Sequence, residues 1–245
     1  RKLFMDYLPI NGTQEVTAIT NAHIRGFYAL LNSKYDQSTS AGYMTKLKAY
    51  IQFGIDNDRI KVNPFQGVKI VKPKKEITYL TEAEVNTIIN ADLGGNLSLE
   101  RVRDAFILMC GSGLAYADLK GLKKSDIQEK DGVFFICGRR VKNNQPYTSV
   151  ILPFAVDVLN KYEVIPVISN QKTNEYLKAI EDIIGFHKHL HCHLARHTYA
   201  TLLINKKVNT KTISKCLGHS NSKITETFYA ELLNDTIIEE VASIF

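Results

Sequence analysis

Three short blocks in the last part of the chain carry residue types that act on phosphate groups. The first block holds His193, Arg196 and His197, the second holds His219, and Tyr229 follows His219 by ten residues (229 − 219). A guanidinium binds phosphate oxygens in pairs, and a histidine exchanges protons near neutral pH. A tyrosine hydroxyl is one of the few side chains that form covalent intermediates. These residues and their order predict a site that handles phosphate.

The charge of the chain is basic, and the excess lies in its first third. The 245 residues include 31 Lys and Arg against 25 Asp and Glu, which gives a formal net charge of +6. Residues 1–77 alone hold 12 basic and 6 acidic residues and therefore account for the whole excess. This suits a module that binds a polyanion, because Lys and Arg displace counterions from phosphates. A solvated lysine-rich surface has the same composition, so charge alone does not separate the two.

The cysteines and the apolar runs indicate a cytoplasmic protein. Cys110, Cys137, Cys192 and Cys216 include no C-x-x-C pair, so we expect thiols in a reducing compartment rather than disulfides. No apolar run approaches the length of a membrane span, and no signal peptide is visible, so we expect no membrane partner. The chain opens at Arg1 without an initiator methionine, which suggests a fragment of something longer.

Residues 1–72 are predicted to form a helical domain. Thr20 is suited to cap one helix, and a longer helix is predicted to open at Ser38 or Ser40. The apolar residues of the longer helix recur at helical spacing: Tyr43, Leu47, Tyr50, Ile51 and Ile55. Residues 73–77 form a charged linker.

Residues 78–245 are predicted to form a second domain, and the fold class is mainly α with a small antiparallel β-sheet (α+β). A capping box at Thr81 and Glu84 begins one helix, and a largely buried helix follows over about residues 99–110. Two short strands are predicted around residues 133–137 and 147–153, and helical patterns resume after them.

The three blocks resemble the catalytic motifs of the tyrosine recombinase, or phage integrase, family. The stretch His193-Leu194-Ala195-Arg196-His197 resembles the family's H-x-L-R-H block, and Leu217-Gly218-His219 resembles its L-G-H block. Tyr229 stands at the spacing that the family uses for its nucleophile. The resemblance is strong over residues 78–245, while residues 1–72 resemble the core-binding domain more weakly and lack its beginning. It implies a two-domain clamp around duplex DNA and a site-specific recombinase, the integrase of a mobile element.

The resemblance also implies a role for each matched residue. Tyr229 would attack the scissile phosphate and form a 3′-phosphotyrosyl bond without a metal or cofactor. Arg196 would bind the nonbridging oxygens and offset the charge of the transition state. His193 would assist proton transfer at the tyrosine, and His219 would hydrogen-bond the phosphate. Lys142, between the two strands, would protonate the departing 5′ oxygen, which is worth roughly 10²–10⁴ in rate.

Two more residues are assigned supporting roles by the same resemblance. Asp118 would hydrogen-bond a histidine or the backbone near the site. His197, next to Arg196, is expected to support the site, although a histidine there also fits a satisfied core position.

One position departs from the family pattern. The G-L-R-x-x-E/D-L block reads Gly113-Leu114-Ala115-Tyr116-Ala117-Asp118-Leu119, so Ala115 stands where the first catalytic arginine is expected. Another cation would then replace it in space, with Arg139, Arg140 and Lys120 as candidates. Alternatively, the enzyme belongs to a subgroup that works without this arginine, or the protein binds DNA with little cleavage. We favour the first two explanations, because the other active-site positions are intact.

Partners follow from the charges and from the tail. The basic residues predicted to contact DNA are Lys46, Lys48, Arg59, Lys123, Lys124, Arg139 and Arg140. The segment 231–245 has apolar residues at helical spacing and is expected either to pack on its own domain or to be donated to a neighbouring protomer. Donation implies a tetramer on DNA. Accessory DNA-bending proteins and a place on the bacterial nucleoid are also implied.

Other classes of protein fit the residues less well. His187, His189, His191 and His193 would share one face of a strand and with Cys192 suggest zinc, but no second Cys/His pair has a finger-like spacing, so no metal is predicted. A type IB topoisomerase-like enzyme would share the chemistry, but the short layout and the tail argue against it. A metal-dependent nuclease would need a carboxylate cluster.

Overall fold

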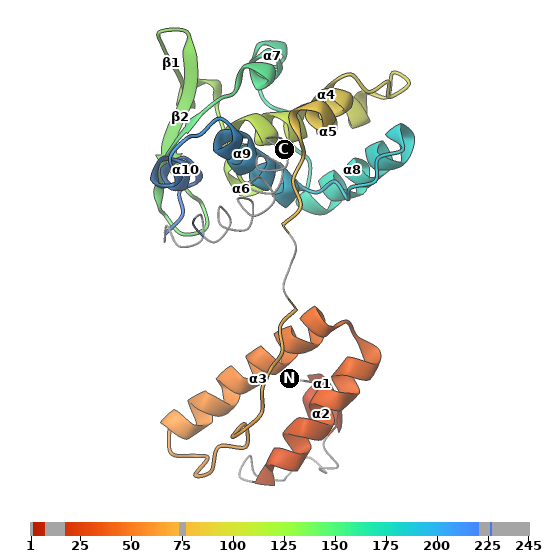
Figure 1. Cartoon of the computed structure of the whole chain (residues 1–245), viewed down its shortest axis with the longest axis vertical. Coiled ribbons are helices and arrows are strands. Elements are labelled where there is room, and N and C mark those ends of the chain that lie inside the picture. The colour runs from red at the N-terminus through yellow and green to blue at the C-terminus, as the bar shows by residue number, and fades with distance from the viewer. Residues whose placement is uncertain (1, 8–17, 74–76, 221–225, 227–245) are drawn as a thin grey trace, which may run out of the picture. The chain divides into compact units, whose positions relative to one another are not determined.

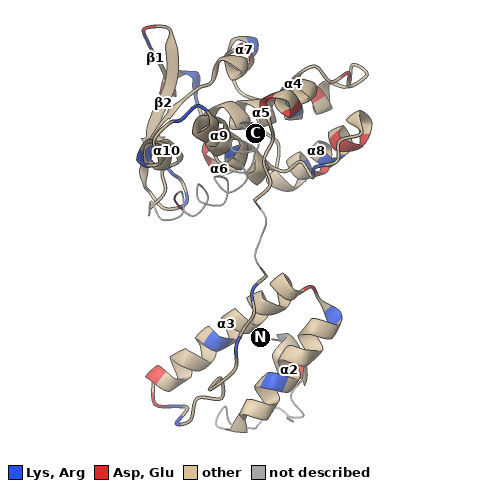
Figure 2. Cartoon of the chain, viewed as in Figure 1, with Lys and Arg blue, Asp and Glu red and all other residues tan. Residues whose placement is uncertain are grey.

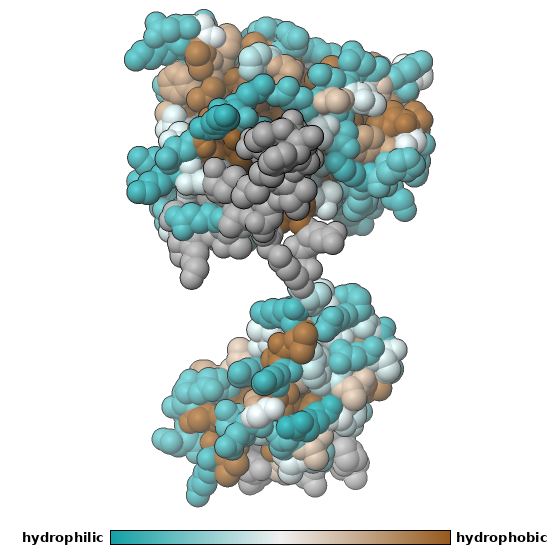
Figure 3. All heavy atoms as spheres, in the orientation of Figure 1, coloured by the Kyte–Doolittle hydropathy of each residue, from teal (hydrophilic) through white to brown (hydrophobic). Residues whose placement is uncertain are grey.

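The computed structural model describes residues 2–7, 18–73, 77–220 and 226, and the chain divides into two compact units (Figure 1). The units are Arg1–Glu76 and Ile77–Phe245, so the division falls inside the linker predicted at residues 73–77. Hydrophilic residues make up much of the described surface that Figure 3 shows. Within the described ranges, no helix is both long and apolar enough to cross a bilayer.

Two long helices, α2 (Asn21–Lys34) and α3 (Gln37–Asp56), build the first unit together with the short α1 (Lys2–Tyr7). The side chain of Thr20 accepts a hydrogen bond from the backbone of His23, which confirms the predicted start of α2. The buried apolar residues of this unit come from all three helices and from the segment after α3: Phe4, Ile24, Phe27, Leu31, Met44, Ile51, Ile60 and Phe65.

The start of α3 differs from the prediction. Its N-cap is Asp36, whose carboxylate accepts hydrogen bonds from the backbone N–H of Thr39 at 2.9 Å and from the Thr39 hydroxyl at 2.6 Å. The helix therefore begins before Ser38 and Ser40, because an aspartate is among the strongest N-cap residues and satisfies one of the free N–H groups there.

The face that α3 buries was also predicted wrongly in part. Tyr43 and Tyr50 are 41% and 68% exposed. Small residues face the core in their place: a side-chain carbon added at Gly54 would lie 2.8 Å from Ile60. Such a close approach leaves no room for an aromatic ring. The buried residues of α3 are Ser40, Ala41, Met44, Ile51 and Gly54.

A central helix, α5 (Leu97–Ser112), organises the second unit, and most of its residues are buried. The helices that contact it are α4 (Glu82–Ile89), α7 (Pro153–Lys161), α8 (Asn170–Ile184) and α9 (Cys192–Asn205). The predicted capping box is confirmed, because the side chains of Thr81 and Glu84 each accept from the backbone of the other residue. The remaining helical segments are α6 (Tyr116–Lys120), a 3-10 turn (Lys124–Asp126) and α10 (Thr210–Leu217).

A three-stranded antiparallel sheet lies beside these helices among the described residues (Figure 1). Its strands are β1 (Ile127–Lys130), β2 (Val133–Arg139) and β3 (Pro146–Val150), paired in that order. β2 and β3 correspond to the predicted strands, and Lys142 lies in their connection. β1 was not predicted, since its polar sequence IQEK buries no complete face.

One buried hydrogen bond ties the entrance of the second unit to α9. The backbone N–H of Leu80 donates to Thr198 Oγ1 at 3.0 Å. We predict that Thr198→Val, which keeps the shape but removes the acceptor, lowers the free energy of unfolding by about 1–3 kcal/mol, because the N–H stays buried without a partner. Urea unfolding measures the change. The control is Thr212→Val on the exposed side of α10; an equal loss from both substitutions would contradict this assignment.

Candidate functional site

Four segments far apart in the sequence bring the candidate site together. Asp118 lies on α6, Arg140 directly follows β2, Arg196 lies on α9 and His219 follows α10. Arg140 Nε donates to the carbonyl oxygen of Leu217 at 2.9 Å, and Arg196 Nη2 donates to the same oxygen. The two guanidiniums therefore lie beside one another at the C-terminal end of α10, in the part of the unit where α6, α9 and α10 gather (Figure 1).

Arg140 is held on several sides at once. Its Nη1 donates to Asp118 Oδ2 at 2.8 Å, and its Nη2 donates to the carbonyl of Cys216 at 2.8 Å. The guanidinium carbon lies 3.8 Å from the centroid of the Tyr147 ring, and the residue is only 5% exposed. A buried charge is tolerated when it is paired and hydrogen-bonded, and Arg140 meets both conditions.

Among the three cations considered for the missing arginine, Arg140 is the one that shares an acceptor with Arg196. Arg139 is exposed, and its Nη1 donates to the carbonyl of Asn144 at 3.0 Å within the same hairpin. Lys120 is exposed on α6. The exposed positions of Arg139 and Lys120 leave Arg140 as the cation that is built into the site.

Arg140 differs from the other basic residues predicted to contact DNA, because it is buried and paired with Asp118. Its contact with DNA stays a prediction. Ala115 is the N-cap residue of α6 and makes no side-chain cap hydrogen bond. The position where the family pattern expects an arginine is therefore only the start of a helix here. The cation beside Arg196 is instead Arg140, which follows β2.

Asp118 connects the buried arginine with the hairpin. Its Oδ2 accepts from Arg140, and its Oδ1 accepts from the backbone N–H of Val141 at 2.9 Å. The carboxylate thus bonds both an arginine and the backbone of the hairpin. Because Val141 precedes Lys142, Asp118 also fixes the base of the connection that carries this exposed lysine.

Arg196 is anchored by the end of α5 and by α10. Its Nη1 donates to the carbonyl of Gly113 at 3.0 Å. Gly113 is the C-cap of α5, which ends at Ser112, two residues later than predicted. Gly113 has a φ of +61°, and a side chain there would collide with Tyr199. Burial, followed by the nearby charge of Arg140, lowers the pKa of Arg196 to about 10, while Asp118 opposes the shift. Arg196 therefore stays positively charged at neutral pH.

Three histidines stand next to the arginines. The rings of His193, which is exposed, and His197, which is half-buried, lie 4.4 Å apart with an edge-to-face geometry. Burial, with the neighbouring histidines and Arg196 as lesser causes, lowers the pKa of His197 to about 4. Burial and then Arg196 and Arg140 lower the pKa of His219 to about 4. His197 and His219 are therefore neutral at pH 7.

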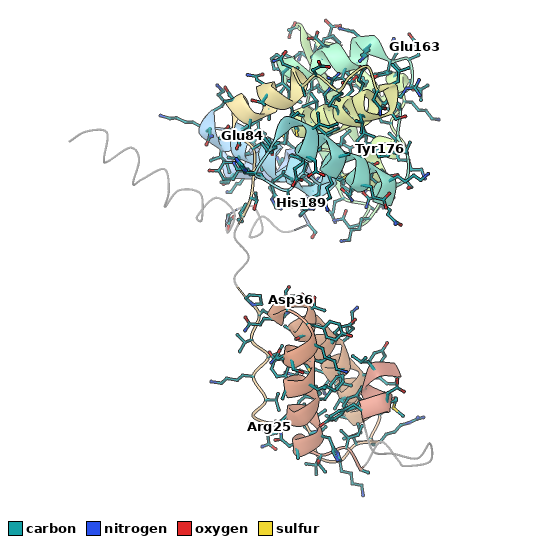
Figure 4. All side chains as sticks on the ribbon, turned by 90° about the vertical axis from the view of Figure 1, so that its right-hand side faces the viewer. Arg25, Asp36, Glu84, Glu163, Tyr176 and His189 are labelled. Carbon is teal, nitrogen blue, oxygen red and sulfur yellow. The ribbon has the colours of Figure 1, made fainter. Side chains whose placement is uncertain are left out.

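The alternating histidines do not lie on a strand, contrary to the expectation. His191 caps α9, and its Nδ1 accepts from the backbone N–H of Leu194 at 3.2 Å, so His193 is already helical. His189, labelled in Figure 4, lies 3.1 Å from a carboxylate oxygen of Glu181. Among the residues that the structure describes, no group of three or more His, Cys, Asp or Glu side chains is placed to hold a metal.

The other basic residues predicted to bind DNA are exposed. Lys46, Lys48 and Arg59 lie in the first unit, and Lys123 and Lys124 lie between α6 and β1. Lys124 forms a surface ion pair with Glu163 at 2.9 Å. Tyr229 and the segment 231–245 lie outside the described residues.

The sequence analysis missed a second basic group around α10 (Figure 2). Lys211 and Lys215 are exposed on α10, and Lys206 and Lys207 are exposed just before it. Lys206 also pairs with Glu82 at 3.0 Å. The four-residue spacing of Lys211 and Lys215 was the available signal, since it places both on one side of a helix.

A comparison with protein families shows the class of protein to which this chain belongs. The model of the phage integrase family matches residues 78–235. The chain therefore belongs to the phage integrase family, the tyrosine recombinases, as its motifs predicted.

Individual relatives agree with this class. The chain is 25% identical over 258 residues to a tyrosine recombinase XerC from Halalkalibacterium halodurans, covering 92% of this chain and 82% of the relative. It is 27% identical over 208 residues to a tyrosine recombinase from Thermosipho africanus, covering 78% and 71%.

Solved structures share the fold and confirm the predicted fold class. The Tn1549 transposon integrase, solved with a circular intermediate DNA, has a TM-score of 0.71 at 16% identity, covering 93% of this chain and 87% of that chain. A lambda integrase (75-356) dimer bound to a COC' core site has a TM-score of 0.72 at 17% identity, covering 93% and 84%.

The depressed pKa values predict how stability depends on pH. Unfolded histidines take up protons near pH 6.5, whereas His197 and His219 do so only near 4 in the folded protein. Lowering the pH between these values therefore favours unfolding. We predict that the free energy of unfolding falls over this range and that His197→Gln combined with His219→Gln reduces the fall. Urea titrations at several pH values measure it, with His187→Gln as the control; an unchanged slope in the double variant would contradict the assignment.

Proposed function

We propose that this chain breaks and rejoins DNA strands at specific sites through a covalent bond between Tyr229 and a 3′ phosphate. Family membership supports the reaction class, and the observation that carries the site assignment is the pair of guanidiniums on the Leu217 carbonyl. The DNA in the solved relatives supports duplex DNA as the substrate. The integrase of a mobile element, acting on the bacterial nucleoid, is the corresponding biological role.

Each step of the proposed reaction forms one phosphoester bond and breaks another. The Tyr229 hydroxyl oxygen bonds to phosphorus while the bond from phosphorus to the 5′ oxygen breaks. The tyrosine proton passes to His193, and the departing 5′ oxygen takes a proton from Lys142. Attack by the 5′ hydroxyl of another strand on the phosphotyrosine reverses both transfers, so rejoining needs no external energy source.

Arg196 and Arg140 stabilise the transition state together in this proposal. Negative charge builds on the nonbridging phosphate oxygens, and prearranged donors in a site with little water are usually the largest catalytic contribution. Arg140 uses one N–H from each nitrogen for protein acceptors. A guanidinium has five N–H groups, so each terminal nitrogen retains one for the phosphate. Arg140 thus takes the part of the arginine that is absent at Ala115.

His219, His197 and Asp118 support these groups. His219, neutral at pH 7, donates a hydrogen bond to a phosphate oxygen without competing with the arginines for charge. His197 packs against His193 and keeps its ring in place. Asp118 supports the site by orienting Arg140 and the hairpin that bears Lys142.

The exposed basic residues of both units contact the DNA backbone. Lys46, Lys48 and Arg59 act from the first unit, which we propose is a core-binding domain comprising residues 1–72. In the second unit, the contacts come from the exposed lysines before β1, from Arg139 in the hairpin and from the lysines around α10: Lys123, Lys124, Lys206, Lys207, Lys211 and Lys215. Four protomers assemble on DNA through the segment 231–245, with accessory DNA-bending proteins aiding synapsis.

The covalent step gives the direct test of this function. The probe is a nicked duplex copied from the joined ends of the mobile element that encodes the chain. The wild-type chain should form an adduct that survives denaturing electrophoresis, and Tyr229→Phe should form none, because it lacks the attacking oxygen. Tyr176→Phe on α8 is the matched control. Adduct formation by Tyr229→Phe, or none by the wild-type chain, would refute the proposal.

The role of Arg140 gives a second prediction. Arg140→Gln should lower the rate of adduct formation by roughly 10²–10³-fold, the range for loss of one prearranged donor. Arg140→Lys should lose less, because it keeps the charge but not the planar fork. Arg139→Gln, next to it and exposed, is the control and should cleave at nearly the wild-type rate.

A rescue separates catalysis from folding. Ala115→Arg added to Arg140→Gln should restore part of the rate, because it returns a guanidinium to the side of α6. Melting temperature and DNA affinity are measured in parallel. Wild-type cleavage by Arg140→Gln would show that Arg140 has no part in the reaction, and a large gain from Ala115→Arg in the wild-type chain would show that the natural site cleaves poorly.

A further inference from the structure

Arg140 packs against the ring of Tyr147 and close to the backbone at Gly218. The guanidinium carbon is 3.8 Å from the ring centroid, and Tyr147 is only 8% exposed. A side-chain carbon added at Gly218 would lie 2.8 Å from Arg140 Cγ and 2.9 Å from Nε. The arginine side chain therefore occupies space that any side chain at position 218 would take, in contact with the aromatic ring.

A second glycine makes room for the ring itself. Tyr147 on β3 pairs with Gly138 on β2, and a side-chain carbon at Gly138 would lie 3.2 Å from the Tyr147 ring. Tyr147 and Ser149 are the buried residues of β3, while their neighbours along the strand are exposed. The Tyr147 ring thus packs over Gly138 of β2 on the buried side of the hairpin, where it contacts Arg140.

Contact with an aromatic ring stabilises the Arg140 guanidinium without neutralising its charge, which a second carboxylate would do. Arg140 and Arg196 repel one another, and Asp118 already neutralises one of the two charges. Another acidic residue would cancel the charge that a phosphate needs. The negative face of an aromatic ring attracts a cation without cancelling its charge, and it contacts the face of the guanidinium rather than its N–H groups. The two N–H groups that Arg140 does not donate to protein acceptors therefore stay available.

We infer that Tyr147 is a positioning residue of the recombinase. Its ring holds the Arg140 guanidinium beside Arg196, so that both guanidiniums can bind the same phosphate. This inference rests on the proposed role of Arg140 in strand cleavage. Tyr147 itself touches no reacting atom. Its effect on the rate must therefore pass through Arg140, which is a condition that an ordinary core tyrosine would not meet.

The test compares variants of Tyr147 on the same nicked duplex, at saturating DNA. Tyr147→Leu, which keeps apolar bulk but removes the ring, should lower the rate of adduct formation about tenfold, the scale of a desolvated cation–π contact. Tyr147→Phe should keep the rate within about twofold, since the ring face remains. Tyr176→Leu, a partly buried tyrosine on α8 (Figure 4), is the matched control. Equal losses in Tyr147→Phe and Tyr147→Leu would overturn the inference.

A double-mutant cycle shows whether the ring acts through Arg140. Tyr147→Leu should have little further effect in the Arg140→Gln background, because the cation that the ring holds is gone. The same tenfold loss in both backgrounds would overturn the inference. Failure of the underlying proposal is distinct from this result, since Arg140→Gln would then cleave at the wild-type rate by itself.

Ring fluorination keeps the test decisive if Tyr147→Leu does not fold. Phenylalanine with one, two or three ring fluorines is placed at position 147, which preserves shape while weakening the negative ring face. The logarithm of the cleavage rate should fall stepwise with fluorine number, whereas the melting temperature should change little. A rate that is independent of fluorination would contradict the positioning role.

Discussion

Two guanidiniums that share one carbonyl oxygen, that of the buried Arg140 and that of the half-buried Arg196, impose the main constraint on the second unit. Like charges at this distance repel, and the charge of Arg140 contributes to the lowered pKa of Arg196. Asp118 compensates one charge. The carbonyls of Cys216 and Leu217 supply the rest, because they end α10, where a helix carries partial negative charge. A phosphate dianion-like transition state would relieve the remaining repulsion, so the arrangement is prepared for an anion.

The fold serves this constraint by bringing backbone ends to the arginines. α5 must end at Gly113 so that its carbonyl reaches Arg196, and α10 must end at Gly218 so that Arg140 fits behind it. Both glycines have positive φ values, +61° and +59°, which residues with a side chain rarely adopt. The geometry around the two arginines therefore depends on helix ends rather than on long stretches of regular structure, and a small shift at either glycine would move one of the two guanidiniums.

Local signals made part of this predictable from the sequence. The blocks around Arg196 and His219 gave the family, and the caps at Thr20 and Thr81 gave two helix starts, because each depends on a few adjacent residues. Pairings over long separations could not be predicted: Arg140 was one of three candidate cations, and only its hydrogen bond to Asp118, 22 residues away, distinguishes it from Arg139 and Lys120. The face of α3 was predicted wrongly in part, because apolar periodicity does not show where a helix packs through a small residue such as Gly54. Tyr147 resembled any alternating strand residue, since its role depends on Gly138, Gly218 and Arg140 together.

The most direct test of the central claim is a crystal structure of the Tyr229→Phe chain bound to the nicked duplex, read for the distances from Arg140 and Arg196 to the scissile phosphate. We expect both guanidiniums to donate to nonbridging oxygens of the same phosphate at about 3 Å, with Arg140 still against the Tyr147 ring. A structure in which Arg140 contacts only Asp118 and the carbonyls of α10, while Lys120 or Arg139 binds the phosphate beside Arg196, would contradict it.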